Sequence, residues 1–145
     1  MRKMRYAVSG KPHEILDKII EAESKVRTDE LWRDDPFDPL SFKQKEKIKK
    51  TVAFAEANPE VWEVFKKHAL YAAVRNRPSG AQNIWERMRY EIYVELAKPD
   101  PDFRLNNDYV AFYPRLFMHR FPQYKEFFET RRSCYDKVIY ENIFI

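Results

Sequence analysis

Apolar residues recur along most of this chain at intervals of three and four, which is the spacing of one buried helix face. One stripe comprises Val61, Val64, Phe65, Ala69 and Ala72. A second comprises Ala81, Ile84, Trp85, Met88, Ile92 and Leu96, and a third Tyr109, Val110, Phe112, Tyr113, Leu116 and Phe117. We therefore predict three amphipathic helices, over residues 59–75, 79–97 and 108–121.

Helix start signals support these assignments. Asn58 before Pro59 suits an N-cap followed by a first helical residue, and Ser79 with Gln82 forms a capping box. Asn106-Asn107-Asp108 offers a cap for the third helix, but Pro114 lies inside that helix. The third helix is therefore either kinked at Pro114 or begins near Tyr113.

The flanking segments are less regular. Residues 1–11 resemble a basic arm, residues 12–27 carry a helical stripe, and residues 32–40 form an irregular connector. Ser41 and Gln44 form a capping box before a helix that reaches about Ala57. Residues 123–132 predict a last short helix. The tail, Val138-Ile139-Tyr140 and Ile143-Phe144-Ile145, is β-prone and fits either an edge strand or a docking segment.

These patterns predict a mainly α fold. We expect a single compact helical domain, residues 1–145, with a helix-turn-helix-like three-helix unit and a short β segment at the C-terminus. Within it, residues 1–40 form an N-terminal arm and helix, residues 41–132 the helical core, and residues 133–145 the C-terminal tail. The chain of 145 residues is long enough to bury one core.

The chain has only two glycines, Gly10 and Gly80. This scarcity disfavours an all-β fold, because tight hairpins need residues with positive φ. It also excludes two phosphate-binding motifs, since neither G-x-G-x-x-G nor G-x-x-x-x-G-K-[ST] occurs in the sequence.

The positive charge is concentrated in one segment. Residues 43–50 hold five lysines and one glutamate, and this net charge of +4 equals that of the whole chain. The other charged residues therefore cancel. Such a run fits either a phosphate-binding patch or a solvated helix face.

The sequence predicts a soluble, cytoplasmic protein. No apolar run approaches the ~18 residues that a membrane-spanning helix requires, and no apolar segment follows the basic start. Cys134 is the only cysteine, so no intramolecular disulfide can form, which suits a reducing compartment.

The helix over residues 79–97 is the best candidate for contact with nucleic acid. In a helix-turn-helix, the second helix presents its first residues to the major groove. Gln and Asn suit adenine, and Arg suits guanine or phosphate. The predicted nucleic-acid-binding residues are Lys43, Lys45, Lys47, Lys49, Lys50, Arg77, Gln82, Asn83, Arg87 and Arg89. Any helical hairpin with polar outer faces is the alternative, and Glu86 and Glu91 weaken the positive field.

Nine aromatic residues lie between Phe103 and Phe128, with Arg104, Arg115, Arg120 and Lys125 among them. Base stacking on exposed rings is one interpretation. The spacing of three to four favours a buried face for most of them, with Tyr113 and Tyr124 as the exceptions whose hydroxyls need polar partners.

The sequence shows no catalytic or metal-binding constellation. His13, His68, His119 and Cys134 lie far apart without the spacing of a zinc site, and Arg104 interrupts the calcium-loop pattern of Asp100 and Asp102. Cys134 with His119 is the one nucleophile pair that can be written. We therefore predict a protein that is not an enzyme and carries no cofactor or metal.

Five segments in order resemble a family of short, largely uncharacterised proteins of bacteriophages and prophages. They are Asn58-Pro59-Glu60-Val61, Ile84-Trp85-Glu86-Arg87-Met88-Arg89, Asn106-Asn107-x-Tyr109, Tyr113-x-Arg115-Leu116 and Phe127-Phe128-x-x-Arg131. The resemblance covers residues 58–132. It implies a bacterial cell and an accessory phage role, but no activity or site residues.

Two functions fit this sequence. The first is non-enzymatic binding of nucleic acid, most simply DNA, by the helix-turn-helix-like unit. The alternative is a protein-interaction module that inhibits or redirects a host protein, for example in anti-defence, since Tyr, Trp and Arg commonly anchor such surfaces. The sequence leaves open whether the protein is a homodimer.

Overall fold

The structure is a computed structural model and describes residues 31–92 and 105–145. Within these ranges, helix accounts for 67% of the residues and no sheet is present. The α-helices are α3 (Phe42–Ala57), α4 (Pro59–Val74), α5 (Ala81–Tyr90) and α6 (Phe112–Arg120). Short 3₁₀ helices are η3 (Asn107–Ala111), η4 (Pro122–Tyr124), η5 (Cys134–Lys137) and η6 (Tyr140–Asn142). The predicted mainly α fold is confirmed.

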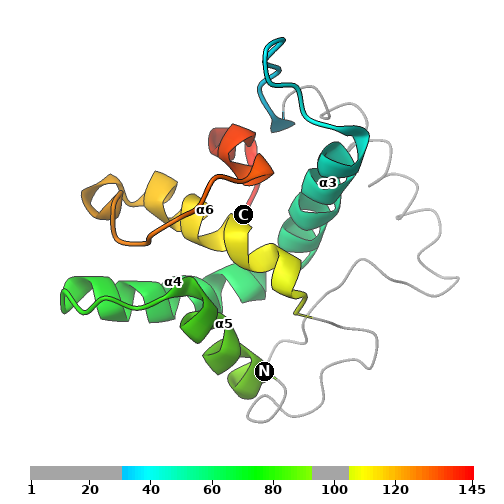
Figure 1. The fold of residues 1–145 in the computed structure, drawn as a ribbon. Helices are drawn as coiled ribbons and strands as arrows, with labels where there is room; N and C mark the ends of the chain where they lie inside the picture. Colours follow the sequence, from blue (N-terminus) through cyan, green and yellow to red (C-terminus); the bar gives the residue numbers. More distant parts are fainter. Residues whose placement is uncertain (1–30, 93–104) are drawn as a thin grey trace, which may run out of the picture.

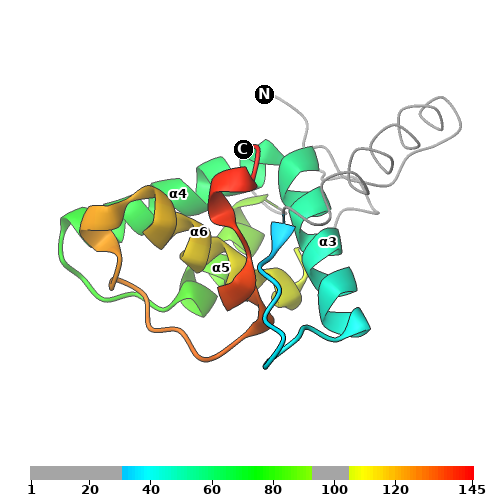
Figure 2. The same ribbon diagram turned by 90° about the horizontal axis from the view of Figure 1, so that it is seen from above.

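Helix α6 lies at the centre of this arrangement. Figure 1 shows α4 and α5 on one side of α6, with α3 and the C-terminal segment on the other. Seen from above, the C-terminal segment runs between α6 and α3, beside the residues that precede α3 (Figure 2). Elements from both ends of the described chain therefore meet against one helix.

The core is built largely from aromatic rings. Phe65 of α4 packs against Tyr113 of α6, with ring centroids 5.7 Å apart, and Tyr113 packs against Trp85 of α5 at 5.3 Å. Phe112 contacts Tyr140 of the tail at 5.6 Å. Aromatic pairs at these separations contribute stability beyond that from the apolar area they bury. The prediction that most of the aromatic-rich segment is core is confirmed, but Tyr113 is fully buried rather than an exception.

Helices α3 and α4 meet at a single residue, Asn58. The predicted capping box at the start of α3 is present, with Ser41 and Gln44 each bonding to the other's backbone. Asn58 stands in the N-cap position of α4, but its side chain makes no capping bond. Its amide instead donates to the carbonyl of Phe54 at 2.9 Å. The asparagine therefore closes the end of α3, because its buried amide faces backward along the chain.

The connection from α4 to α5 is longer than predicted. Helix α4 ends at Val74 and α5 begins at Ala81, so residues 75–80 separate them. Asn76 has a φ of 49°, the left-handed conformation that asparagine tolerates. The predicted Ser79 cap is wrong. Gly80 is the N-cap with extended backbone, and the Ser79 side chain lies one residue too early to take that role.

Pro114 lies in the first turn of α6, which begins at Phe112. A proline is tolerated there because its missing N–H would have no helical acceptor. The residues before it form η3, capped by Asn106, whose side chain accepts from the amide of Asp108 at 2.8 Å. The choice between a kink and a late start is thus resolved in favour of a helix beginning near Tyr113.

The C-terminal segment is a docking segment. One isolated antiparallel bridge joins Trp32 to Val138, and the described residues contain no strand beyond this bridge. The amide of Ile139 donates to the carbonyl of Leu31 at 2.8 Å. Between Pro122 and Arg132 only η4 forms, so the predicted helix over 123–132 is wrong. A single 3₁₀ turn, which begins at Pro122 and ends at Tyr124, takes its place.

Several predicted segments lie outside the described residues. These are the arm over 1–11, the helix over 12–27, the end of the 79–97 helix, and Phe103 with Arg104. Helix α5 is followed by a π turn at residues 91–92, where the description stops. Of the helices that can be assessed, none combines the length and the apolar character required to cross a bilayer.

Candidate nucleic-acid interface

The lysines of α3 divide into two stripes. Residues three and four apart share a helix face, so Lys43, Lys47 and Lys50 form one stripe, here called the η3-side stripe. Lys47 lies 4.0 Å from Asp108 of η3, which fixes the direction of this stripe. Lys43 and Lys50 are exposed and make no ion pair with any residue that the structure describes. Two cations without acidic partners are therefore available to bind phosphate.

Lys45 and Lys49 occupy the opposite flank of α3. The Lys45 ammonium lies 6.0 Å from the ring centroid of Trp32, and Lys49 pairs with Glu46 at 3.0 Å. Both therefore have partners within the molecule. The five lysines predicted as one patch do not act as one, because a helix distributes consecutive residues around its circumference.

Helix α5 turns Ile84, Trp85 and Met88 inward and leaves a polar outer face. That face carries the predicted residues Gln82, Asn83 and Arg87, all exposed. Gln82 donates to Glu86 at 2.9 Å, so this amide is already held by its neighbour. Asn83 and Arg87 make no side-chain hydrogen bond to any described residue, so they are less constrained than Gln82.

Arg89 lies at the edge of this face and binds within the protein. Its guanidinium donates to Glu86 at 2.7 Å, to the carbonyl of Leu105 at 2.6 Å and to the side chain of Asn107 at 2.6 Å. Its partners use both terminal nitrogens, so it has little capacity left for a base edge. Arg89 thus positions α5 against the residues that lead into η3.

The η3-side stripe and α5 border the same short segment. Lys47 reaches Asp108, and Arg89 reaches Asn107, the residue immediately before it. Both views place η3 between α3 and α5 (Figures 1 and 2). Asp108 and Glu86 lie within this surface and reduce its positive potential. The η3-side stripe and the outer face of α5 therefore lie on either side of η3, and the acidic Asp108 lies between them.

Two further residues belong to the surroundings of α5. Arg77, in the α4–α5 connection, is exposed and has no ion pair within residues 31–92 and 105–145, as a phosphate contact requires. Tyr90, which the candidate set omitted, is 60% exposed at the end of α5. Its position seven residues after Asn83 places it on the same outer face, so helical periodicity alone could have identified it.

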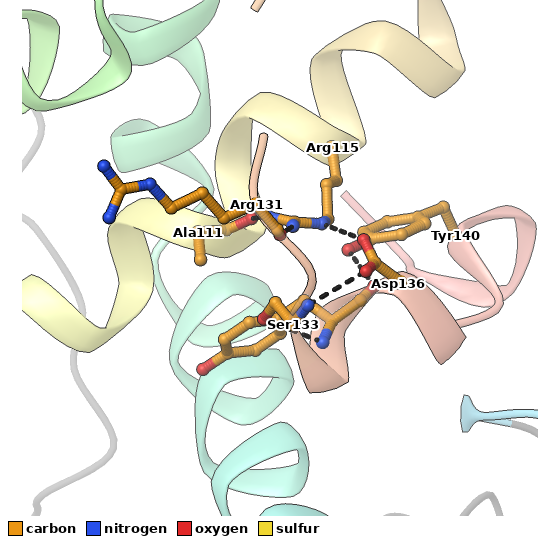
Figure 3. A network of polar contacts seen from close by, with 7 residues as sticks. Ala111, Arg115, Arg131, Ser133, Asp136 and Tyr140 are labelled. Atoms are coloured by element: carbon orange, nitrogen blue, oxygen red, sulfur yellow. Dashed lines mark hydrogen bonds and ion pairs between the residues drawn. The ribbon is translucent and has the colours of Figure 1, made fainter. Parts of the chain in front are cut away.

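The arginines among the aromatic residues are anchors for the tail. Arg115 is only 8% exposed and donates to Asp136 at 2.7 Å and to the carbonyls of Ala111 and Arg131 at 2.6 Å each. Figure 3 shows these contacts converging on one guanidinium, with the Arg131 side chain directed away from them. Arg120 donates to the carbonyls of Ile143, at 2.9 Å, and Ile145. Neither arginine is free to contact a nucleic acid.

A second polar cluster joins α4 to the residue after α5. Glu91 accepts from Lys67 and pairs with His68, each at 2.7 Å. Burial alone raises the pKa of Glu91, but the hydrogen bonds from Lys67 and His68 outweigh it and hold the pKa below its usual value. This cluster fixes the relative position of the two helices and places charge beside the α5 face.

Within the described residues, no group of three or more His, Cys, Asp and Glu side chains is arranged to hold a metal ion. No hydrogen bond joins Cys134 to His119. His119 instead lies 3.6 Å from Glu141 and 6.1 Å from the Tyr140 ring centroid.

We compared the chain with family models, with curated proteins and with solved structures, and none of these comparisons finds a match.

Proposed function

We propose that this protein binds nucleic acid without catalysing a reaction, using the η3-side stripe of α3 and the outer face of α5. Lys43, Lys50 and Arg77 would contact phosphates, while Asn83 and Arg87 would approach the bases. DNA is the first substrate to test, since a groove-fitting helix suits the major groove of a duplex.

The observation that carries this proposal is the shared border. Lys47 and Arg89 contact consecutive residues, Asp108 and Asn107, so cations of α3 lie beside the face of α5. Unpaired cations near one exposed helix are the electrostatic pattern of a phosphate-binding surface. The six-residue connection exceeds the 3–4-residue turn typical of a helix-turn-helix, so the unit resembles that motif without its tight turn.

The test is duplex binding measured by fluorescence anisotropy across a salt series. We expect affinity to fall as salt rises, because bound phosphates release counterions. Lys43→Gln with Lys50→Gln should reduce the slope of log affinity against log salt by about 2. The matched control, Lys45→Gln with Lys49→Gln, removes the same charge from the opposite flank and should leave the slope unchanged.

Two outcomes would contradict this proposal. Absence of binding at low salt would exclude duplex DNA as the ligand. Equal losses in the two double variants would show that net charge, rather than the η3-side stripe, governs binding.

The second candidate function is a protein-interaction module. It is favoured by large exposed apolar side chains on several elements, among them Tyr71, Val74 and Tyr90. The resemblance to phage proteins supports a bacterial cytoplasm as the setting, and a host protein as the target. A pull-down from nuclease-treated host lysate separates the two functions, since one stoichiometric protein partner favours this candidate.

A further inference from the structure

The ring of Tyr71 and the guanidinium of Arg75 form an exposed stack at the end of α4. The Arg75 Cζ atom lies 3.6 Å from the centroid of the Tyr71 ring, and Tyr71 is 62% exposed. Arg75 also donates to the Tyr71 carbonyl at 3.1 Å, which holds the guanidinium over the ring. Because aromatic rings and guanidinium groups both stack on planar partners, this pair offers an ordered surface to a planar ligand.

The stack lies on an edge of α4 that is joined to α5. Lys67 of α4 pairs with Glu91, the residue after α5, at 2.7 Å. Residues four apart share a helix edge, so Tyr71 continues the edge of Lys67 along α4. Arg87 likewise continues the edge of Glu91 along α5. Both edges extend from this ion pair toward residues 75–80, which connect the two helices (Figure 1). The stack and Arg87 therefore border one area, here called the α4–α5 surface.

The charges of the α4–α5 surface leave a positive excess. Arg75, Arg77 and Arg87 are exposed, and none of them makes an ion pair within the described part of the chain. Glu91 is already bound by two side chains of α4. Glu86 is bonded on the other edge of α5, which faces η3. Three cations are therefore available on this surface to bind phosphate.

This combination of rings and cations favours a single strand of nucleic acid over other partners. Tyr90, three residues after Arg87 and therefore beside it, is 60% exposed and adds a second ring. By contrast, the exposed ring of Phe37 lies on a turn with Asp35 and Asp38, which repel phosphate. A single strand presents planar bases together with phosphates, whereas a duplex offers only base edges in its grooves.

We propose that the α4–α5 surface binds single-stranded nucleic acid, with a base stacked on the Tyr71–Arg75 pair and neighbouring phosphates bound by Arg77 and Arg87. This inference rests on the proposed function, because it names the form of nucleic acid that the protein takes. It places the stacked base on residues apart from the η3-side stripe, so the two can be tested separately.

The first experiment measures binding of a labelled oligothymidylate of about 10 nucleotides by fluorescence anisotropy. We expect Tyr71→Ala to weaken binding by about 10-fold without changing the salt dependence, because it removes a ring and no charge. Tyr71→Phe should retain native affinity, since the ring face and not the hydroxyl contacts the base. Phe37→Ala is the matched control, because it removes an exposed ring from an acidic setting. Circular dichroism will show that the variants retain the native helical content.

The second experiment detects the stack directly through Tyr71→Trp. The three native tryptophans, Trp32, Trp62 and Trp85, are all buried, so the new indole is the one that solvent and ligand can reach. We expect the oligothymidylate to quench its fluorescence, because a stacked base contacts the indole face. A duplex of equal length should quench it far less, and Phe37→Trp should show no quenching by either.

The results separate this inference from the proposed function. Tyr71→Ala without effect on single-strand binding, or equal losses in Tyr71→Ala and Phe37→Ala, would overturn the inference and leave duplex binding by the η3-side stripe untouched. Single-strand binding that depends on Tyr71, in a protein that does not bind duplex, would support the inference alone. No binding of the oligothymidylate at low salt would overturn it, and a host protein retained through Tyr71 would then be the partner of this surface.

Discussion

Helices α6 and α3 both carry cations, but they use them differently. Arg115 of α6 is buried, and its guanidinium binds three acceptors, two of them main-chain carbonyls. Lys43 and Lys50 of α3 face solvent and have no ionic partner in the described part of the chain. The arginine fixes the C-terminal segment, whereas the lysines remain available to an outside anion.

This difference follows from the chemistry of the two side chains. A guanidinium presents five donors in a fixed plane and can satisfy several carbonyls at once, while an ammonium is a compact, strongly hydrated charge. Buried backbone carbonyls need partners, and arginine supplies them. Four predictions test this contrast, from the largest expected effect to the smallest.

Arg115→Ala should lower the free energy of unfolding by about 3 kcal/mol, because it leaves two carbonyls and the Asp136 carboxylate without their donor. Urea unfolding followed by circular dichroism measures this change. Arg131→Ala is the control. Arg131 contributes only its carbonyl, so the loss should stay within about 0.5 kcal/mol. Equal losses would show that Arg115 is no anchor.

The contact between α3 and the tail should respond unequally to its two partners. The Thr51 hydroxyl donates to the Lys47 carbonyl at 2.8 Å and lies 2.8 Å from the Tyr135 hydroxyl. Burial raises the pKa of Tyr135 to about 12. Thr51→Val leaves this phenol unpaired and should cost about 2 kcal/mol, whereas Tyr135→Phe leaves Thr51 bonded and should cost about 1 kcal/mol. Thermal unfolding of both variants measures the two losses. A larger loss of stability for Tyr135→Phe than for Thr51→Val would contradict this prediction.

Glu91 should make stability fall in acid. Its pKa is lower in the folded protein than in the unfolded chain, because Lys67 and His68 bind the carboxylate. Its contribution is therefore complete above the unfolded pKa and is lost as pH falls through the folded value. Glu91→Gln should cost about 1 kcal/mol at neutral pH and less in acid. Denaturation curves from pH 7 to pH 3 measure this, and a constant difference would contradict it.

Lys43→Gln with Lys50→Gln should leave stability unchanged within about 0.5 kcal/mol, since exposed charges without partners contribute little. The same measurement by urea unfolding applies. A clear loss of stability would mean that these lysines stabilise the fold, and the contrast drawn with Arg115 would then be wrong.

The sequence predicted the helices better than their ends. The periodic stripes of α4 and α6 arise because each helix buries one face, so they can be recognised in the sequence of one chain alone. Ser41 was identified correctly because its capping box is local. Asn58 was also placed correctly as the N-cap of α4, but its side-chain amide bonds backward to the Phe54 carbonyl, which the local sequence does not indicate.

The candidate site was harder to predict, because partners distant in sequence decide which cations are free. Arg89 matched Arg87 in type and in helix, yet Leu105 and Asn107 bind only Arg89. Likewise, Arg115 appeared to be one of several cations beside aromatic rings until Asp136 and the tail were in place. Local pattern contains no information on such pairings.

The tail that Arg115 and Arg120 hold also sets the order of folding. Asp38 is bonded to Lys137 across 99 positions of sequence, and Leu31 is bonded to Ile139. During synthesis these contacts cannot form until Lys137 and Ile139 have emerged from the ribosome. Until then, part of the apolar surface of helices α3 and α4 stays exposed to solvent. Because the contacts close a long loop, the final folding step is slow.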